Sequence, residues 1–286
     1  MEAGRPSRTA LGAASHRAAH QVLEGGRIFT DPLALRILGE DADSAIRNAE
    51  EDPARRRMRL FIAVRTRFAE DALAAAIECG VQQLVVLGAG LDTYAYRGTL
   101  RERLRIFEVD HPATQAWKQQ RLADAAIPVP DNLTFAPVDF ERQDLASGLR
   151  AAGFDSARQT FFMWLGVVPY LTAEATWSTL GFIGSLPGGG HVVFDYSDPP
   201  ASFSAEERIV HERRAAHVAE FGEAWVNYFE ADELRSKLAD LGFPEVEDLG
   251  PAEIRSRYFP QTAEDGRVKG GHIVRASVWQ RRALPL

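Results

Sequence analysis

Residues Leu84 to Arg97 read LVVLGAGLDTYAYR, and the rest of the chain is organised around this stretch. Its short apolar run, Leu84 to Leu87, contains two valines, which is typical of a buried strand. The turn Gly88-Ala89-Gly90 lets the backbone bend tightly and puts no large side chain between the backbone and a ligand. The stretch therefore predicts a strand that ends at a ligand-binding turn.

A second apolar run, Leu104 to Val109, carries Glu108 and is followed by Asp110. These acids come roughly 20 residues after the first glycine, about the spacing at which a carboxylate meets a ribose in nucleotide-binding α/β folds. One of them can accept hydrogen bonds from ribose hydroxyls, while the other has a structural role. Together the two runs predict a pocket for an adenosine cofactor.

The residues after the turn favour one class of cofactor. Thr93 stands where the dinucleotide fingerprint has its third glycine. Asp92 would put a negative charge where a pyrophosphate binds, which is unfavourable. A cofactor with a cationic amino-acid end tolerates that charge, so Asp92 favours S-adenosylmethionine over NAD(P). The alternative is that Asp92 only caps the following helix.

The composition is that of an ordinary globular protein, with 286 residues, 45% of them apolar and 26% charged. This length suits a single domain over residues 1–286. The net charge of −7 argues against a nucleic-acid partner. The lone Cys79 allows no internal disulfide, and we expect it to be buried. The sequence contains neither a membrane span nor a signal peptide, so we expect a cytoplasmic protein without a membrane partner.

The residues before the glycine turn have helical patterns. Residues 1–53 predict a helical N-terminal extension, with helices over Ser7–Gln21 and Leu33–Leu38, the second introduced by Thr30-Asp31-Pro32. The polar segment Asp41–Pro53 is expected to be a loop or a frayed helix.

A longer helix is predicted over Ala54–Glu78, because its apolar residues recur at three- and four-residue spacings. Arg65 lies deep in this helix between the apolar Val64 and Phe68. The four arginines at the start of the helix are expected to face solvent. They are Arg55, Arg56, Arg57 and Arg59.

Strands and helices then alternate. The predicted strands are Gln83–Leu87, Arg105–Val109, Leu133–Pro137, Thr160–Leu165 and His191–Tyr196. The predicted helices are Pro112–Ala125, Asp144–Ala152 and one from Thr172 to Ser185. This alternation predicts an α/β fold in which helices cover both faces of a parallel sheet.

The pattern changes after Asp198. Helices are predicted over Ala205–Glu220, Asp232–Leu241 and Ala252–Tyr258, and the last strands over Glu245–Leu249 and His272–Trp279. We expect residues 197–230 to form a cap or insertion over the strand ends.

Other residues that could take part in chemistry lie near strand ends. Asp139 follows the third strand, where it could meet an adenine amino group with Phe140 packed on the ring. No metal is expected, because His16 and His20 share helical spacing but lack a third ligand.

Several segments together resemble the leucine carboxyl methyltransferase family, in particular its bacterial branch of S-adenosylmethionine-dependent methyltransferases. They are VVLGAGLDTYAYR at Val85–Arg97, FEVDHPATQAWKQQRL at Phe107–Leu122 and RTRFAED at Arg65–Asp71, and the likeness reaches from Ser7 to Phe243. The resemblance implies a class I methyltransferase (Rossmann-like) fold, a seven-stranded and mostly parallel sheet with an antiparallel last strand.

The resemblance also implies the roles of individual residues. Arg65 would hold the carboxylate of the cofactor's methionine part, and the Gly88–Gly90 turn would line the same end. Asp110, helped by Glu108, would hold the ribose, while Asp139 and Phe140 would meet the adenine.

The chain departs from the family at one position. Where the family has an acid after the fourth strand, in an EGVxxYL pattern, this chain has Leu165-Gly166-Val167-Val168-Pro169-Tyr170-Leu171. Leu165 therefore replaces an acid near the methionine amine, which puts a leucine-carboxyl substrate in doubt. Tyr170 matches the family's tyrosine and could face the methyl group as a catalytic residue.

The expected function is S-adenosylmethionine-dependent methyl transfer, with S-adenosylhomocysteine as the product, to a carboxylate or hydroxyl of a small molecule. A hydroxyl acceptor needs a general base, for which Tyr170, Asp195, Tyr196 and His211 are candidates by position only. An NAD(P)-dependent oxidoreductase and a non-catalytic cofactor-binding regulatory protein are the alternatives. The sequence does not determine the oligomeric state.

Overall fold

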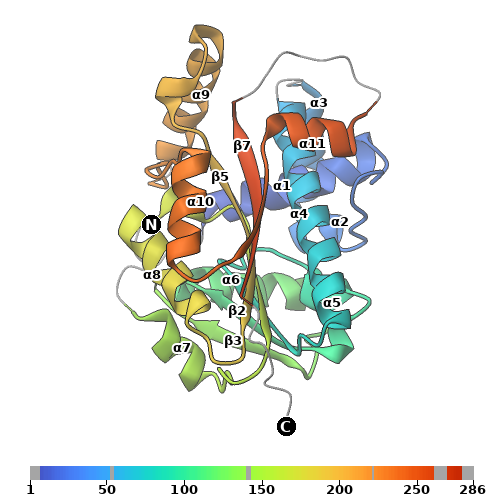
Figure 1. The fold of residues 1–286 in the computed structure, drawn as a ribbon. Coiled ribbons are helices and arrows are strands. Elements are labelled where there is room, and N and C mark those ends of the chain that lie inside the picture. The colour runs from blue at the N-terminus through green and yellow to red at the C-terminus, as the bar shows by residue number, and fades with distance from the viewer. Residues whose placement is uncertain (1–6, 52–54, 140–142, 221, 261–268, 279–286) are drawn as a thin grey trace.

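A single twisted sheet organises the protein (Figure 1). The computed structural model describes residues 7–51, 55–139, 143–220, 222–260 and 269–278. Seven strands lie in the order β3-β2-β1-β4-β5-β7-β6. They are β1 (Gln83–Leu87), β2 (Arg105–Asp110), β3 (Leu133–Pro137), β4 (Thr160–Trp164), β5 (Gly190–Ser197), β6 (Glu245–Leu249) and β7 (Gly271–Val278).

All seven strands were predicted within one residue at each described end, and β1, β3 and β6 have the predicted bounds. Trp279, the predicted end of β7, lies outside the described residues. β7 runs antiparallel to β5 and β6, whereas the other neighbouring strands are parallel. The expected class I methyltransferase fold is confirmed by this mostly parallel sheet with its reversed strand.

The register brings the important strand ends to one edge. Leu87 of β1 pairs with Val109 of β2, and Val86 pairs with Met163 of β4. The glycine turn and Asp110 directly follow the first pair, and Leu165 lies two residues after Met163. The sheet therefore gathers them at its carboxyl edge, where open α/β sheets bind ligands.

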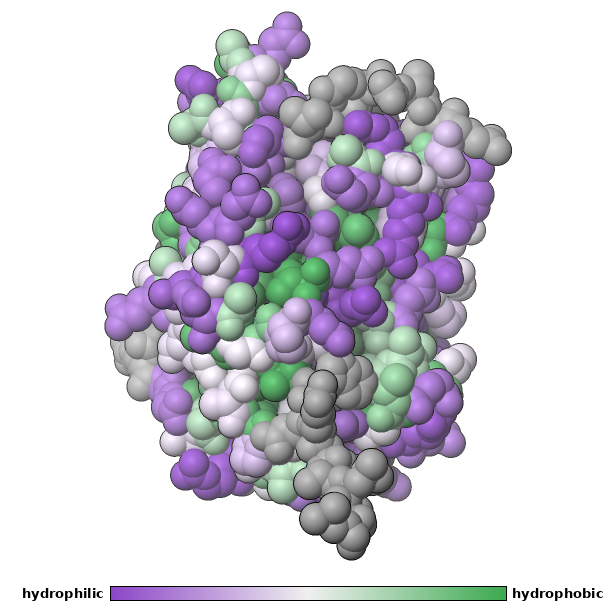
Figure 2. Space-filling view, viewed as in Figure 1, coloured by the Kyte–Doolittle hydropathy of each residue, from purple (hydrophilic) through white to green (hydrophobic). Residues whose placement is uncertain are grey.

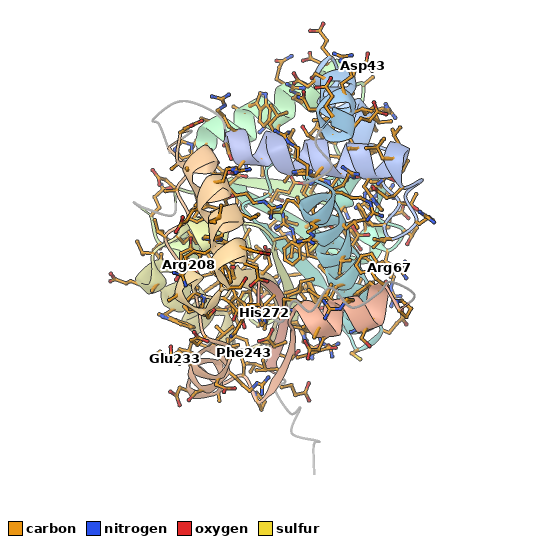
Figure 3. All side chains as sticks on the ribbon, turned by 90° about the horizontal axis from the view of Figure 1, so that it is seen from above. Asp43, Arg67, Arg208, Glu233, Phe243 and His272 are labelled. Atoms are coloured by element: carbon orange, nitrogen blue, oxygen red, sulfur yellow. The ribbon has the colours of Figure 1, made fainter. Side chains whose placement is uncertain are left out.

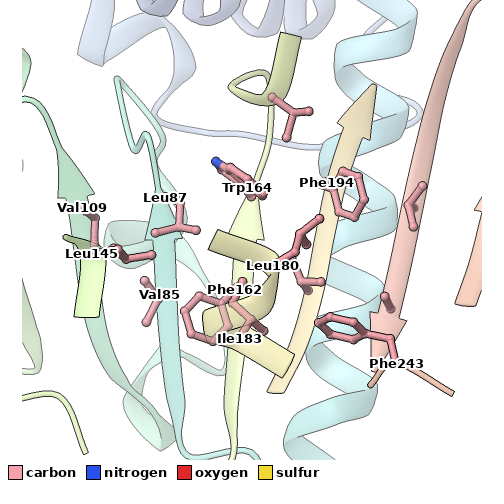
Figure 4. Close-up of a cluster of buried hydrophobic side chains, with 14 of the residues drawn as sticks. Val85, Leu87, Val109, Leu145, Phe162, Trp164, Leu180, Ile183, Phe194 and Phe243 are labelled. Carbon is pink, nitrogen blue, oxygen red and sulfur yellow. The ribbon is translucent and has the colours of Figure 1, made fainter. Parts of the chain in front are cut away.

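Helices cover both faces of the sheet, as predicted. On one face, α7 (Leu145–Ala151), α8 (Ala173–Gly184) and α10 (Ala231–Asp240) close a core that contains Trp164 and Phe194 (Figure 4). On the other face, α4 (Arg55–Glu78), α5 (Tyr94–Arg97) and α11 (Pro251–Tyr258) close a second core. Alternate residues of each strand enter opposite cores, as the pleat requires.

The N-terminal helices form a third cluster with α6 (Pro112–Asp124) and Leu91. They are α1 (Arg8–Leu23), α2 (Ala34–Leu38) and α3 (Asp41–Glu51). Of the two expectations for Asp41–Pro53, a loop or a frayed helix, the loop was wrong for Asp41–Glu51, which is helical with Ala45 and Ala49 buried. Two buried alanines in an otherwise polar segment give a weak sequence signal.

Two expectations about single residues of α4 and its end were also wrong. Arg59 does not face solvent: it is only 4% exposed, and its Nε and Nη2 donate to the two carboxylate oxygens of Glu24, each at 2.8 Å. This bidentate pair explains how a charged residue can be buried. Cys79, expected to be buried, is exposed at the end of α4.

The predicted cap includes α9 (Ala205–Ala219), which extends past the end of the sheet (Figure 1). The segment after α9 returns to the body, where Val226 N donates to Pro169 O and Phe229 N donates to Ser197 O. Polar residues cover most of the face in Figure 2, with apolar residues surfacing near its middle. No described helix is long and apolar enough to cross a membrane. That residues 197–230 cover an active site stays a prediction.

A buried polar network joins β5, β6 and β7. His272 on β7 lies near α11 in Figure 3 and contacts Asp198 through Nε2 (3.1 Å) and Asp248 through Nδ1 (2.9 Å). Tyr196 OH donates to Asp248 at 2.8 Å, and Lys269 Nζ donates to Asp198 at 3.0 Å. Burial opposes the charge on His272, but its two carboxylate partners outweigh burial and raise its pKa to about 9.

The network predicts a stability loss in mild alkali. Because the pKa of His272 is higher in the folded state, its protonation stabilises the folded protein. This stabilisation is complete below the unfolded pKa of about 6.5 and is lost as the pH rises through about 9. The free energy of unfolding should therefore fall between these pH values, by up to about 3 kcal/mol. Urea denaturation across this range should show a steeper fall for the wild type than for His272→Gln. Parallel profiles would contradict the assignment.

Candidate cofactor site

The glycine turn is packed against other parts of the chain. Gly88 and Gly90 have φ values of +63° and +45°, which side-chain-bearing residues rarely adopt. A Cβ at Gly88 would lie 2.3 Å from Val167 Cγ2, and one at Gly90 would lie 2.9 Å from the Cβ of Ala10 on α1. Both positions therefore require glycine for backbone conformation and for close approach.

A cavity of about 60 Å³ lies beside the turn. Its lining brings together residues of α1, α4, the turn and the end of β4. Among the described lining residues, three are charged: Arg17, Arg65 and Asp92. Sites for small molecules usually measure about 300–1,000 Å³. A nucleoside-sized ligand therefore needs the residues over the turn to move, and α1 is the element that covers it.

Arg65 reaches this cavity, in agreement with its predicted position. The residue is 9% exposed, and its Nη1 donates to Oδ2 of Asp195 on β5 at 2.8 Å. Its Nε is buried without a hydrogen-bond partner. Leu165, the residue in place of the family acid, also lines the cavity. The cation and the apolar substitution thus lie at the same end of the site.

Asp92 and Asp110 lie on either side of the turn. Asp92 lines the cavity, and its Oδ1 accepts from Tyr94 N at 2.8 Å, so it caps α5 as well. Asp110 accepts from Gly90 N at 2.5 Å and from His111 N at 2.7 Å. Burial raises the pKa of Asp110, while the two backbone donors oppose that rise. Each oxygen of Asp110 retains a lone pair for a further donor.

Glu108 is placed differently from Asp110. It is fully buried, with Lys118 Nζ of α6 2.7 Å from its Oε2 and with Tyr96 OH donating to the same oxygen at 3.2 Å. Burial raises the pKa of Glu108 to about 7, although Lys118 acts against this. Glu108 is not among the residues lining the cavity. Of the two acids, it is the one placed for a structural role.

The structure does not bring the remaining predicted residues to the cavity. Asp139 is half-buried, with Oδ2 4.0 Å from His111 Nε2, and Phe140 lies outside the described residues. Tyr170 ends a 3₁₀ turn, Val168–Tyr170, and is half-buried. Burial raises the pKa of Tyr170. Neither Asp139 nor Tyr170 is part of the cavity lining.

Sequence reasoning missed the contacts that fix the N-terminal helices over the site. Asp31 Oδ2 accepts from Thr93 Oγ1 at 2.7 Å, and Arg97 Nε lies 3.3 Å from Asp31 Oδ1. Arg17 lies 3.7 Å from the same carboxylate and donates to Leu91 O at 2.5 Å. The Asp31-Pro32 pair was the one available sequence signal, and it suggested only the start of a helix.

The family model described as leucine carboxyl methyltransferase matches residues 10–184. The chain belongs to this family. The matched residues include α1, the glycine turn, Asp110, Leu165 and Tyr170, so most of the proposed site lies within the match. The family predicted from the sequence is confirmed.

Bacterial relatives extend the match. A Bacillus subtilis protein named "Putative S-adenosyl-L-methionine-dependent methyltransferase YktD" is 36% identical over 200 residues, which cover 68% of this chain and 64% of that protein. The chain thus spans slightly less than two thirds of that relative. A Mycolicibacterium paratuberculosis protein of the same description is 31% identical, with 90% of each chain covered.

Among solved structures, magnesium protoporphyrin IX methyltransferase from Synechocystis with bound S-adenosylhomocysteine has a TM-score of 0.45 and 12% identity. That similarity covers 93% of this chain and 99% of the other.

The packing of α1 on the turn can be tested with a double-mutant cycle. Gly90→Ala should destabilise the protein by about 1–3 kcal/mol, because it adds both a strained φ and an overlap with Ala10. In an Ala10→Gly background, the overlap is relieved and only the strain remains, so the same change should cost less. Urea denaturation of the four proteins measures the difference. Equal costs in both backgrounds would show that α1 does not contact the turn.

Proposed function

We propose that this protein is an S-adenosylmethionine-dependent methyltransferase that methylates an oxygen of a small molecule, with a carboxylate as the favoured acceptor. The observation that carries the proposal is the charge arrangement around the glycine turn. A buried arginine and a carboxylate, Arg65 and Asp92, line one small cavity, and Asp110 lies behind the turn.

These residues fit the chemistry of the cofactor. The methionine part of S-adenosylmethionine carries a carboxylate and an ammonium group, which need a cation and an anion. Arg65 supplies the cation, and Asp92 has one oxygen that is not engaged by Tyr94. The free lone pairs of Asp110 can accept hydrogen bonds from the ribose hydroxyls. Leu165 stands where the family has an acid. Among the described lining residues, Asp92 is therefore the single residue with a carboxylate that can bind the ammonium group.

The same arrangement disfavours NAD(P). A pyrophosphate needs free backbone N–H groups at a helix N-terminus. Here Tyr94 N, at the start of α5, already donates to Asp92. A phosphate at that position would also lie close to the Asp92 charge. The oxidoreductase alternative therefore finds no support at the turn.

The need for a general base helps to distinguish the acceptors. When bound, the cofactor supplies a methyl group already activated on a sulfonium, so the chain's task is to orient the acceptor and exclude water. The half-buried Tyr170 has a pKa raised by burial, so near neutral pH it holds its proton and can donate a hydrogen bond. A carboxylate acceptor needs no base and accepts that hydrogen bond.

The other residues considered as bases are already engaged. Asp195 accepts from Arg65 and Gly166, and Tyr196 donates to Asp248. His211 on α9 is 3.1 Å from Tyr228 OH, and burial lowers its pKa. These contacts favour an acceptor that ionises without help over a hydroxyl.

Cofactor binding is the first test. Calorimetry should detect S-adenosylhomocysteine binding with a micromolar Kd, and Asp110→Asn should weaken it at least about tenfold, since the acceptor for the ribose loses its charge. Asp155→Asn is the matched control, because Asp155 is a half-exposed carboxylate before β4, at the opposite edge of the sheet. Unchanged affinity in Asp110→Asn would refute the ribose contact. A folded wild type that binds neither S-adenosylmethionine nor its product would refute the function.

The acceptor is the second test. A panel of small carboxylic acids and alcohols should be incubated with S-adenosylmethionine labelled in its methyl group. A carboxylate acceptor gives a methyl ester, which releases labelled methanol in mild base, whereas a methyl ether keeps the label. Turnover that yields only base-stable products would contradict the preference for carboxylates.

A further inference from the structure

Arg65 is fixed by a carboxylate that sequence reasoning considered only as a base. Asp195 lies on β5, on the sheet face covered by α4, and its Oδ2 accepts from Arg65 Nη1 at 2.8 Å. Its Oδ1 accepts from Gly166 N, just after β4, at 2.6 Å. Asp195 is 4% exposed. One buried side chain therefore joins β5, the end of β4 and the cation of α4.

Gly166 confines the guanidinium from a second side. Its φ is +70°, and a Cβ placed there would lie 2.6 Å from Arg65 Nη2 and 2.9 Å from Nη1. The guanidinium thus packs directly against the backbone of Gly166, where no larger residue would fit without displacing it. Asp195 holds one nitrogen of Arg65 while Gly166 limits the plane of the group.

This arrangement leaves one edge of the guanidinium for a ligand. Asp195 engages Nη1, so the opposite edge consists of Nε and Nη2. Arg65 Nε is buried and has no hydrogen-bond partner. A buried donor without an acceptor is unfavourable, and a guanidinium edge with two parallel N–H groups matches a carboxylate. The Nε/Nη2 edge of Arg65 therefore has the geometry to bind a carboxylate through two parallel hydrogen bonds.

We propose that Asp195 is a positioning residue that aims the Nε/Nη2 edge of Arg65 at the carboxylate of the cofactor's methionine part. This inference rests on the proposed function. It assigns Asp195 no proton transfer, since both of its oxygens are occupied by donors.

Removing the Asp195 charge changes the affinity for a carboxylate at Arg65 in opposite directions under two explanations, so the direction of the change distinguishes them. If Asp195 acted on the ligand only through its charge, its removal would strengthen the binding of a carboxylate at Arg65, because a competing anion disappears. If it positions Arg65, its removal releases the guanidinium and weakens that binding. Weaker binding confined to the ligand that carries the carboxylate is therefore the outcome that only positioning predicts.

The experiment compares two ligands by calorimetry. S-adenosylhomocysteine carries the carboxylate, whereas its decarboxylated analogue keeps the amine and lacks the carboxylate. The wild type should prefer S-adenosylhomocysteine by at least tenfold. In Asp195→Asn this preference should fall to about twofold or less, through weaker binding of S-adenosylhomocysteine, while the analogue binds within about threefold of its wild-type affinity.

Asp248→Asn is the matched control, since Asp248 is another buried carboxylate, on β6, paired with His272. It should change the melting temperature without changing the ligand preference. If Asp195→Asn does not fold, Gly166→Ala supplies a second test, because its methyl group displaces the Arg65 guanidinium while the Asp195 charge is kept. It should remove the same preference.

The outcomes separate the two proposals. A wild type that binds neither ligand refutes the proposed function. A wild type that prefers the carboxylate, together with an Asp195→Asn variant that keeps or increases this preference, overturns the positioning role alone. Equal losses for both ligands would also overturn it, since they would indicate only a structural role.

Discussion

The buried carboxylate of Asp31 holds the site together. It is 2% exposed and lies among Thr93 and Arg97, at the two ends of α5, and Arg17 of α1. Removing one partner of such a buried charge group is strongly destabilising, because the remaining charges lose their compensation. Through this carboxylate the N-terminal helices are fixed to the residues after the glycine turn, so α1 can lie over the turn. The shape of the cavity depends on that attachment.

Other buried carboxylates have the same kind of role. Glu24 ties α4 to the end of α1 through Arg59, Glu108 ties β2 to α6 through Lys118, and Asp195 ties β5 to α4 through Arg65. Such pairs contribute little net stability compared with apolar packing, but they specify one arrangement of the elements they join. Around this site they determine where each strand end lies relative to its helix. The apolar cores supply the stability, and the ion pairs supply the orientation.

The sequence predicted the sheet well, because each parallel strand is a short apolar run ended by a turn or a polar residue. The strand–turn pattern pointed to Asp92 and Asp110, and the family resemblance pointed to Arg65 on α4; that these residues bind the cofactor stays a prediction. The solvent exposure predicted for Arg59 was wrong, because nothing within the run of arginines indicates that an acid 35 residues away, Glu24, pairs with one of them. The Asp195–Arg65 pair spans 130 residues and leaves no local pattern. The position of α1 over the turn depends on tertiary packing of alanines, which sequence periodicity does not reveal.

The contact between α1 and the glycine turn has a consequence for how affinity is set. A ligand larger than the cavity of about 60 Å³ binds only the fraction of molecules in which α1 has moved away. The measured dissociation constant is then the intrinsic constant divided by that fraction. Asp31, which holds α1 closed from outside the cavity lining, therefore sets affinity without contacting the ligand. How firmly the N-terminal helices close is then a determinant of affinity separate from the contacts that the ligand itself makes.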